Sequence, residues 1–202
     1  MPSFTEYSLF DQDKMASSIL DKCPKRINNG IVDIESIIPE YAGIRVECAY
    51  GLKRQFDTWA YISVSQLKIF IDASLMDTNS IMYLKKYRFT LAEELAHFLL
   101  HKDIYKNCNS AKDRLEIHKN IGDAQVGRLD RQAKALAGSL LLPKEKVENR
   151  MEKLVPEHGI EQDGVDIICR ILGREFDVNH TAVRKRLKNL GYHDRLGMKL
   201  YS

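Results

Sequence analysis

The chain of 202 residues lacks long apolar runs, closely paired cysteines and a strong charge of either sign. No run of about 18 apolar residues occurs, so no membrane-spanning helix is expected. The four cysteines, Cys23, Cys48, Cys108 and Cys169, show no CxxC spacing, which fits reduced thiols better than a disulfide framework or a zinc knuckle. The net charge of +3 is too small to indicate a nucleic-acid partner by itself.

The amino-terminal residues 1–15 also lack the basic start and apolar run that a secretory signal requires. Neither an internal repeat nor a low-complexity tract occurs. With 44% hydrophobic and 29% charged residues, the composition is that of an ordinary globular protein. We therefore expect a soluble, cytoplasmic protein with one core and a small appended module.

Hydrophobic periodicity and breaker residues predict helices first, then a small sheet. Two short helices are expected over residues 11–23 and 31–38, the second ended by Pro39. Stretches rich in β-branched and aromatic residues predict three strands, at 44–50, 58–64 and 67–72. We expect them to form an antiparallel sheet, with a turn at Gly51 joining the first two.

The rest of the chain is predicted to be mainly helical. Helices are expected over 89–101, 129–142 and 144–154, and the polar segment 106–127 between them is expected to be a loop or a mobile helix-loop segment. After a linker at 156–164, residues 165–190 have a helix-turn-helix outline.

The segment Glu93-Glu94-Leu95-Ala96-His97 carries the candidate chemistry. It is the HExxH pattern with its first histidine replaced by glutamate. In HExxH, two histidines on one helical face bind a metal, and the glutamate acts as general base on the metal-bound water. Glu93 and His97 keep that spacing, and the helix around them is apolar, so a charged pair there needs a partner or a metal.

A simpler interpretation remains open for the same residues. The two glutamates could be solvated surface charges, and His97 a partly buried core histidine. His101 could join the same helical face, or it could cap the carboxyl end of the helix, where a protonated imidazole is favoured.

A third metal ligand must come from elsewhere, and Asp130 is the candidate. Ala133 and Ala137 lie three and seven residues further on, so this face of the helix is narrow and permits close approach to a neighbouring helix. Alternatively, Asp130 caps the start of its helix and the two alanines only fill the core.

In three places the chain resembles the ImmA/IrrE family of metallo-endopeptidases. Residues 88–101, RFTLAEELAHFLLH, are similar to the family's RFTLAHELGHxLLH, and residues 130–143, DRQAKALAGSLLLP, are similar to its ExxANxFAxxLLMP. Residues 176–191 are similar to its FxVSxxAxxxRLxxLG tail. The resemblance implies an α+β fold: a zincin-like peptidase domain over residues 1–143, with a small twisted β-sheet and central helices, then a helical helix-turn-helix-like module over 144–202.

The resemblance also implies a function. The theme of the family is intracellular cleavage of a helix-turn-helix repressor, which releases a mobile-element or stress response. The family places the metal at Glu93, His97 and Asp130, with Glu94 as general base. The strand at 67–72 could align an extended peptide substrate by edge pairing.

Three departures from the family motifs bear on chemistry, namely Glu93 for histidine, Asp130 for glutamate and Lys134 for asparagine. A divalent ion together with Glu, His and Asp ligands has no net charge, so the bound ion is a poorer Lewis acid. A ligand set with two carboxylates also suits manganese or iron better than zinc. Aspartate is also shorter than glutamate by about 1.5 Å. Lys134, on the face of Asp130, could pair with Glu93 and replace the metal, or it could extend into solvent and leave Glu93 to bind metal.

Three classes of function therefore remain open. The first is a metallo-endopeptidase holding one divalent ion, and the second is a degenerate peptidase fold that holds no metal and binds a repressor or toxin without cutting it. The third is a DNA-binding regulator, for which the basic residues are Arg184, Lys185, Arg186 and Lys188. We favour a helix that packs on the peptidase domain over DNA binding, because nearby acidic residues offset this charge. No membrane partner is expected.

Overall fold

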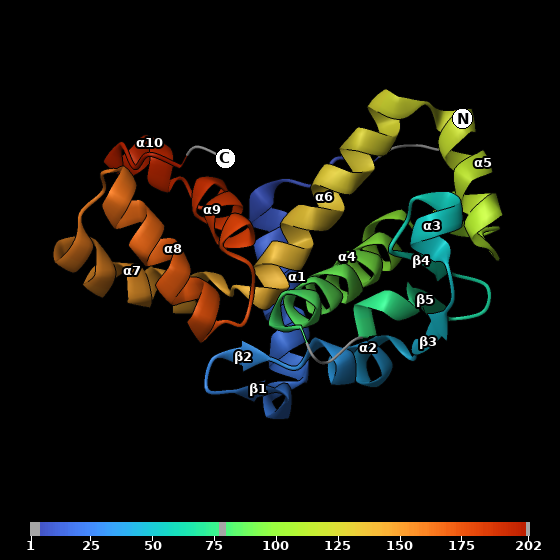
Figure 1. The fold of residues 1–202 in the computed structure, drawn as a ribbon, viewed down its shortest axis with the longest axis horizontal. Helices are drawn as coiled ribbons and strands as arrows, with labels where there is room; N and C mark the ends of the chain where they lie inside the picture. Colours follow the sequence, from blue (N-terminus) through green and yellow to red (C-terminus); the bar gives the residue numbers. More distant parts are fainter. Residues whose placement is uncertain (1–4, 77–79, 201–202) are drawn as a thin grey trace.

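The structure is a computed structural model that describes residues 5–76 and 80–200. As expected, the fold is α+β. Figure 1 shows two long crossing helices, α4 (Ile81–Tyr105) and α6 (Asp123–Leu141), with a small sheet on one side and the carboxyl-terminal helices on the other. None of the helices in the described ranges is long and apolar enough to cross a membrane.

The remaining elements are short. The other helices are α1 (Leu9–Lys22), α2 (Ile34–Ala42), α3 (Leu52–Phe56), α5 (Ala111–Ile121), α7 (Lys144–His158), α8 (Gln162–Glu175), α9 (His180–Asn189) and α10 (Tyr192–Leu196), with 3-10 turns η1 (Pro24–Arg26) and η2 (Ala73–Met76). The strands are β1 (Ile27–Asn28), β2 (Ile31–Val32), β3 (Arg45–Ala49), β4 (Ala60–Ser63) and β5 (Lys68–Asp72).

The main sheet contains the three expected strands in the order β3-β5-β4. The prediction of an antiparallel sheet is right for β4 and β5 but wrong for β3, which runs parallel to β5. Residues 50–67 between β3 and β5 are long enough for the crossover that a parallel pair requires. They include α3, which begins after Gly51, so Gly51 does not form the expected hairpin turn.

This strand order also corrects the predicted peptide-binding edge. Since β5 lies in the middle of the sheet, it has a hydrogen-bonded neighbour on both sides, and the segment 67–72 cannot pair with a substrate. The edge strand next to the site is β4, which packs on α4.

The predicted helix at 31–38 also needs correction. Residues Ile31 and Val32 form β2, and helix α2 starts only after Asp33, whose side chain accepts a hydrogen bond from the Ser36 N–H at 3.2 Å. Pro39 lies inside α2 and does not end it. The helix ends at Gly43, which adopts a left-handed conformation with φ of 66°.

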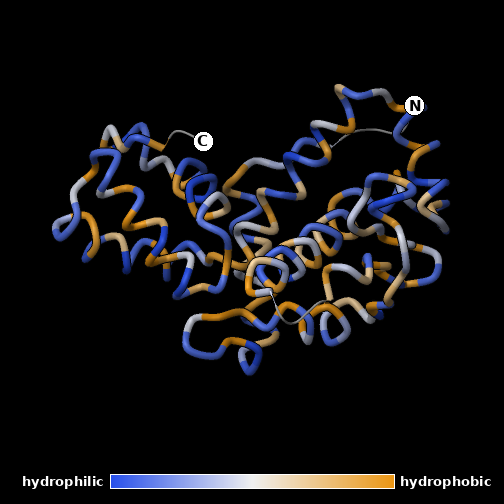
Figure 2. Tube along the Cα trace, in the orientation of Figure 1, coloured by the Kyte–Doolittle hydropathy of each residue, from blue (hydrophilic) through white to orange (hydrophobic). Residues whose placement is uncertain are grey.

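The core centres on the contact between α4 and α6. The side chains of Leu91 and Leu95 on α4 are fully buried, as are Ala133 and Ala137 on α6. The two alanines are fully buried, which agrees with the narrow face predicted from the sequence, and α6 packs closely against α4. Figure 2 shows that the amino-terminal part of α6 is largely polar, whereas its later part, beside α4, is largely apolar.

The polar segment 106–127 is more regular than predicted. It contains α5, whose amino end is capped by Ser110, and the first residues of α6, with Gly122 at a φ of 80° between the two helices. Helix α6 thus starts at Asp123 and not near residue 129. Asp130 therefore lies in the interior of the helix, which excludes the alternative that it caps the helix start.

The carboxyl-terminal helices have the expected helix-turn-helix outline. Helix α8 is followed by a turn at residues 176–179 and then by α9. The predicted linker at 156–164 is shorter than expected, because α7 continues through Pro156 to His158 and α8 starts at Gln162.

Two cations of α4 attach this tail to the rest of the protein. The Lys85 ammonium donates hydrogen bonds to the carbonyl oxygens of Gly173 (2.7 Å) and Val178 (3.2 Å), at the end of α8. Arg88 donates to the carbonyl of Asp177 and forms an ion pair with its carboxylate, both at 3.3 Å. A positive charge at a helix carboxyl end is favourable, so α4 stabilises the turn between α8 and α9.

Arg186 makes a second attachment, from α9 to α1 and α6. Its guanidinium is buried, donates to the carbonyl of Leu142 at 3.0 Å and pairs with Asp13 at 2.6 Å. Arg186 is one of the four basic residues considered for DNA binding, and here it is part of the core.

Replacing Arg186 tests this attachment. We expect Arg186→Ala to lower the free energy of unfolding by about 3 kcal/mol, because Asp13 loses the buried partner of its ion pair. Chemical denaturation of Lys188→Ala, an exposed residue on the same helix, provides the control and should change stability by less than about 0.5 kcal/mol. Equal effects of the two substitutions would contradict a structural role for Arg186.

Candidate functional site

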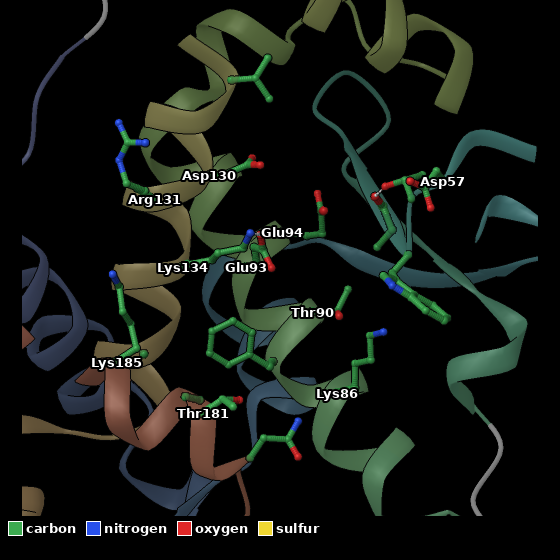
Figure 3. Close-up of a pocket in the computed structure, with 18 of the residues that line it drawn as sticks. Asp57, Lys86, Thr90, Glu93, Glu94, Asp130, Arg131, Lys134, Thr181 and Lys185 are labelled. Atoms are coloured by element: carbon green, nitrogen blue, oxygen red, sulfur yellow. Dashed lines mark hydrogen bonds and ion pairs between the residues drawn. The ribbon is translucent and has the colours of Figure 1, made fainter. Parts of the chain in front are cut away.

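A cavity of about 830 Å³ lies between α4, α5, α6, α9 and the segment before β4. Figure 3 shows Glu93, Glu94 and Thr90 on α4, Asp130 and Lys134 on α6, and Thr181 and Lys185 on α9 around this cleft. The second helix of the tail therefore shapes the cleft wall, as we favoured from the sequence.

The three predicted metal ligands converge in the cleft. One potential ligand atom from each of Glu93, His97 and Asp130 lies within 4.8 Å of those of the other two. The His97 Nε2 atom is 3.6 Å from the Asp130 Oδ1 atom, which is close to the spacing of two ligands on one metal ion. His97 is completely buried, whereas Glu93 and Asp130 are partly exposed to the cleft.

A chain of hydrogen bonds sets the tautomer of His97. Gln132 Nε2 donates to the carbonyl of Thr5, so its Oε1 accepts from His101 Nε2 at 3.0 Å. His101 Nδ1 is then an acceptor for the Nδ1–H of His97 at 3.2 Å. This leaves the buried Nε2 of His97 without a proton and without a hydrogen-bond partner, facing Asp130.

Burial supports the same state of His97. It lowers the pKa of His97 well below the ordinary value, and the charge of Arg114 lowers it further, so the ring is neutral. A neutral imidazole with a free nitrogen lone pair is the form that binds metal. The helix is kinked at His101, whose backbone is not helical (φ −131°), close to the predicted helix end. Burial lowers the pKa of His101, so it orients His97 as a neutral ring and is not a protonated cap. The Glu, His and Asp donors thus fit a divalent cation.

The predicted general base, Glu94, is not free. The Arg114 Nη1 atom lies 2.9 Å from each oxygen of the Glu94 carboxylate, and both side chains are almost completely buried. Burial acts to lower the pKa of Arg114, but the Glu94 carboxylate raises it overall, so the guanidinium stays charged. Glu94 is therefore the counter-ion of a buried arginine.

The same ion pair occupies the edge of β4. Arg114 also donates to the carbonyl of Ala60 at 3.2 Å, and the N–H of Ile62 donates to Glu94. Ala60 and Ile62 are two residues apart, so their backbone groups point to the same side of the strand. The Ala60 carbonyl and the Ile62 N–H, two of the groups with which this edge could hold an extended peptide, already have partners within the chain.

Lys134 lies beside the first ligand position. Its ammonium is 3.7 Å from Glu93 Oε1. Burial raises the pKa of Glu93 to about 7, although Lys134 acts to lower it. A cation thus stands within ion-pair distance of the carboxylate that replaces the family's histidine.

Arg114 and His118 are site residues that our sequence analysis missed, because we treated their segment as a loop. Both line the cleft from α5, and His118 Nε2 is 3.0 Å from the Tyr105 hydroxyl. Burial lowers the pKa of His118 to about 4. The spacing of Ala111, Arg114 and His118, together with the capping residue Ser110, is a helical signal that could have located them.

The basic residues of α9 are only partly available for DNA. Arg184 forms an ion pair with Asp166 on α8, and Arg186 is buried. Lys185 lines the cleft, and Lys188 is exposed on the outer surface. Two of the four basic residues, Arg184 and Arg186, are therefore engaged in contacts within the protein.

Comparisons with known proteins agree with this architecture. The family model of the IrrE N-terminal-like domain, a peptidase family, matches residues 70–188. No curated protein matches significantly. Among solved structures, a Mycobacterium tuberculosis transcriptional regulator superposes with a TM-score of 0.60 at 17% identity, over 95% of this chain and 49% of that protein. The chain thus spans about half the length of that regulator, and at this identity the likeness concerns the fold alone.

The Glu94–Arg114 ion pair can be tested by a double-mutant cycle. Arg114→Met should lower the free energy of unfolding by about 3 kcal/mol, because it leaves a buried carboxylate without its counter-ion. Adding Glu94→Gln should restore much of that loss, since the amide carries no charge. Denaturation midpoints provide the measurement, with Lys112→Met on the exposed face of α5 as the control. Simple additivity of the two substitutions would argue against the pair.

The raised pKa of Glu93 predicts a pH dependence of stability. A carboxyl whose pKa rises from 4.5 to about 7 on folding contributes stability below pH 4.5 that is lost as the pH rises to about 7. Glu93→Gln removes this loss, so its melting temperature should exceed that of the wild type more at pH 8 than at pH 5. Glu116→Gln, at an exposed position of α5, serves as the control, and a difference independent of pH would refute the assignment.

Proposed function

Within the IrrE N-terminal-like peptidase family, to which the chain belongs, we propose that this protein binds a segment of a protein partner in its cleft but does not cut it. The observation that carries this proposal is the contact between Arg114 and both oxygens of Glu94. A general base must be free to accept a proton from water, and both oxygens of Glu94 already accept from Arg114, although burial raises the pKa of Glu94 overall.

The charges in the cleft support the same proposal. A metallopeptidase balances its carboxylates with a divalent ion, whereas here two cations of the chain, Arg114 and Lys134, lie beside Glu94 and Glu93. With Glu93 partly protonated near neutral pH, these cations nearly balance the carboxylates without a metal. A bound divalent ion would have to overcome repulsion from both.

For the partner we propose a helix-turn-helix repressor. The resemblance to the ImmA/IrrE family supports this choice, because its members act on such repressors. Sequestering a repressor would control a mobile-element or stress response without proteolysis, and it implies a cytoplasmic location. DNA binding by α9 receives less support, because Arg184 and Arg186 are held by Asp166 and Asp13.

Metal-dependent cleavage of the repressor is the second candidate, and the orientation of His97 favours it. Glu93, His97 and Asp130 would hold one divalent ion, either zinc or, with two carboxylate ligands, manganese or iron. When bound, the ion would polarise the scissile carbonyl and lower the pKa of water. Glu94 can act as general base only if Arg114 releases it.

Lys134 gives a direct test of metal binding. Lys134→Met should raise the affinity for Zn²⁺ or Mn²⁺ about tenfold or more, because it removes a positive charge next to Glu93. Isothermal titration of the metal into chelator-treated protein measures the change. Arg131→Met, which removes an exposed charge from the same helix, should have a smaller effect. If the wild-type protein, purified without chelator, contains one tightly bound metal ion per chain, Lys134 does not take the place of the metal beside Glu93.

Cleavage itself separates the two candidate functions. Incubating the wild-type protein with a helix-turn-helix repressor and added Zn²⁺ or Mn²⁺ should yield a stable complex and an intact repressor, assayed by size exclusion and mass spectrometry. Cleavage by the wild type that Glu94→Gln abolishes, with binding retained, would establish the peptidase instead.

A further inference from the structure

Three cations along the cleft have no acidic partner among the residues that the structure describes. Lys86 on α4, Arg131 on α6 and Lys185 on α9 all line it, and the structure assigns none of them an ion pair within residues 5–76 and 80–200. Figure 3 shows Lys86 on the α4 side and Lys185 on the α9 side, with the Arg131 side chain on the flank of α6 that points away from Glu93. The cleft therefore carries positive charge on two facing walls.

The acidic residues of the cleft do not neutralise these cations. Asp57 pairs with Lys53, and Glu93 and Glu94 pair with Lys134 and Arg114. The remaining carboxylate, Asp130, lies near His97 at the candidate metal site. After these pairs are formed, the cleft keeps an excess of positive charge that a ligand could balance.

Lys86 is the most constrained of the three cations. Its ammonium lies 3.5 Å from the centre of the Trp59 ring, and Lys53 approaches the same ring at 5.3 Å. Burial lowers the pKa of Lys86, and the charge of Lys53 lowers it further. A carboxylate of a ligand would relieve the repulsion between the ammonium groups of Lys86 and Lys53.

The surroundings favour a polypeptide over a nucleic acid. Glu93 and Asp130 repel any anion beside them, so the carboxylates of a ligand would have to lie at Lys86, Arg131 and Lys185, away from the candidate metal site. Two ammonium groups crowd Trp59, which hinders stacking of a base on its ring. Phe89 and Thr90 line the cleft as well, and they suit an apolar side chain and a hydrogen-bonding group of a peptide.

We propose that the cleft recognises an acidic stretch of the partner protein, whose carboxylates contact Lys86, Arg131 and Lys185. This inference rests on the proposed function and specifies the class of partner. Recognition uses side chains more than strand addition, because the edge groups of Ala60 and Ile62 already have partners in the chain.

Trp59 is the single tryptophan of the chain and therefore reports binding directly. The full-length protein is titrated with three synthetic peptides of one length, in which alanine alternates with glutamate, glutamine or lysine, and Trp59 fluorescence is followed. The glutamate peptide should bind at least tenfold more tightly than the glutamine peptide, and its affinity should fall on raising the salt. Similar affinities for the glutamate and glutamine peptides would overturn the proposal.

Charge reversal on α9 supplies a matched pair of variants. Lys185→Glu, on the cleft wall, should weaken binding of the glutamate peptide roughly tenfold, whereas Lys188→Glu, on the outer surface of the same helix, should change it less than about twofold. Lys86→Met is measured by calorimetry, since it alters the surroundings of Trp59, and it should also weaken binding. If Lys185→Glu and Lys188→Glu weaken the binding of the glutamate peptide equally, the peptide is attracted only by the overall charge of the protein. That result would refute recognition by the cleft.

The outcomes distinguish this inference from the function on which it rests. Preference for the glutamine or lysine peptide would refute the acidic specificity and leave peptide binding in the cleft intact. Failure of all three peptides to bind, together with salt-sensitive binding of random duplex DNA that Lys185→Glu abolishes, would overturn both.

Discussion

The buried ion pair between Glu94 and Arg114 is the interaction on which the architecture of the site depends. A carboxylate with 3% of its surface exposed, at the centre of α4, requires a positive partner. Arg114 supplies it from α5 and also holds the edge of β4 through Ala60. The pair therefore joins two helices and a strand, forms one wall of the cleft, and occupies the group on which peptide hydrolysis would rely.

Much of the fold could be predicted from the sequence, because the spacing of apolar and small residues along each segment indicates its secondary structure and its buried face. The spacing of Glu93 and His97 on an apolar helix, and of Ala133 and Ala137 on a second one, allowed two helices in close contact, and the family resemblance then selected Asp130 as the residue opposite His97. The structure shows this arrangement. The three strands and the helix-turn-helix tail were predicted for the same reason, and the family match confirms the resemblance.

What the sequence could not reveal are the contacts between distant segments. The parallel pairing of β3 with β5 depends on a crossover through α3 and β4, which no periodicity records. Arg114 looked like one charge among many in a polar segment, and its role depends on a carboxylate 20 residues earlier in the chain. That Lys86 and Lys185 have no acidic partner in the described part of the chain is likewise a property of three-dimensional placement.

The contacts of Lys85 and Arg88 with the end of α8 and the turn after it limit where the chain can be truncated. Both residues lie on the helix that carries Glu93, one to two turns before it. A truncation after Pro143 would strip these cations of their acceptors and expose the apolar surface that α9 covers. The helical tail thus stabilises the helix that carries Glu93 and His97, and a chain cut at this point should be less stable for reasons that have nothing to do with ligand binding.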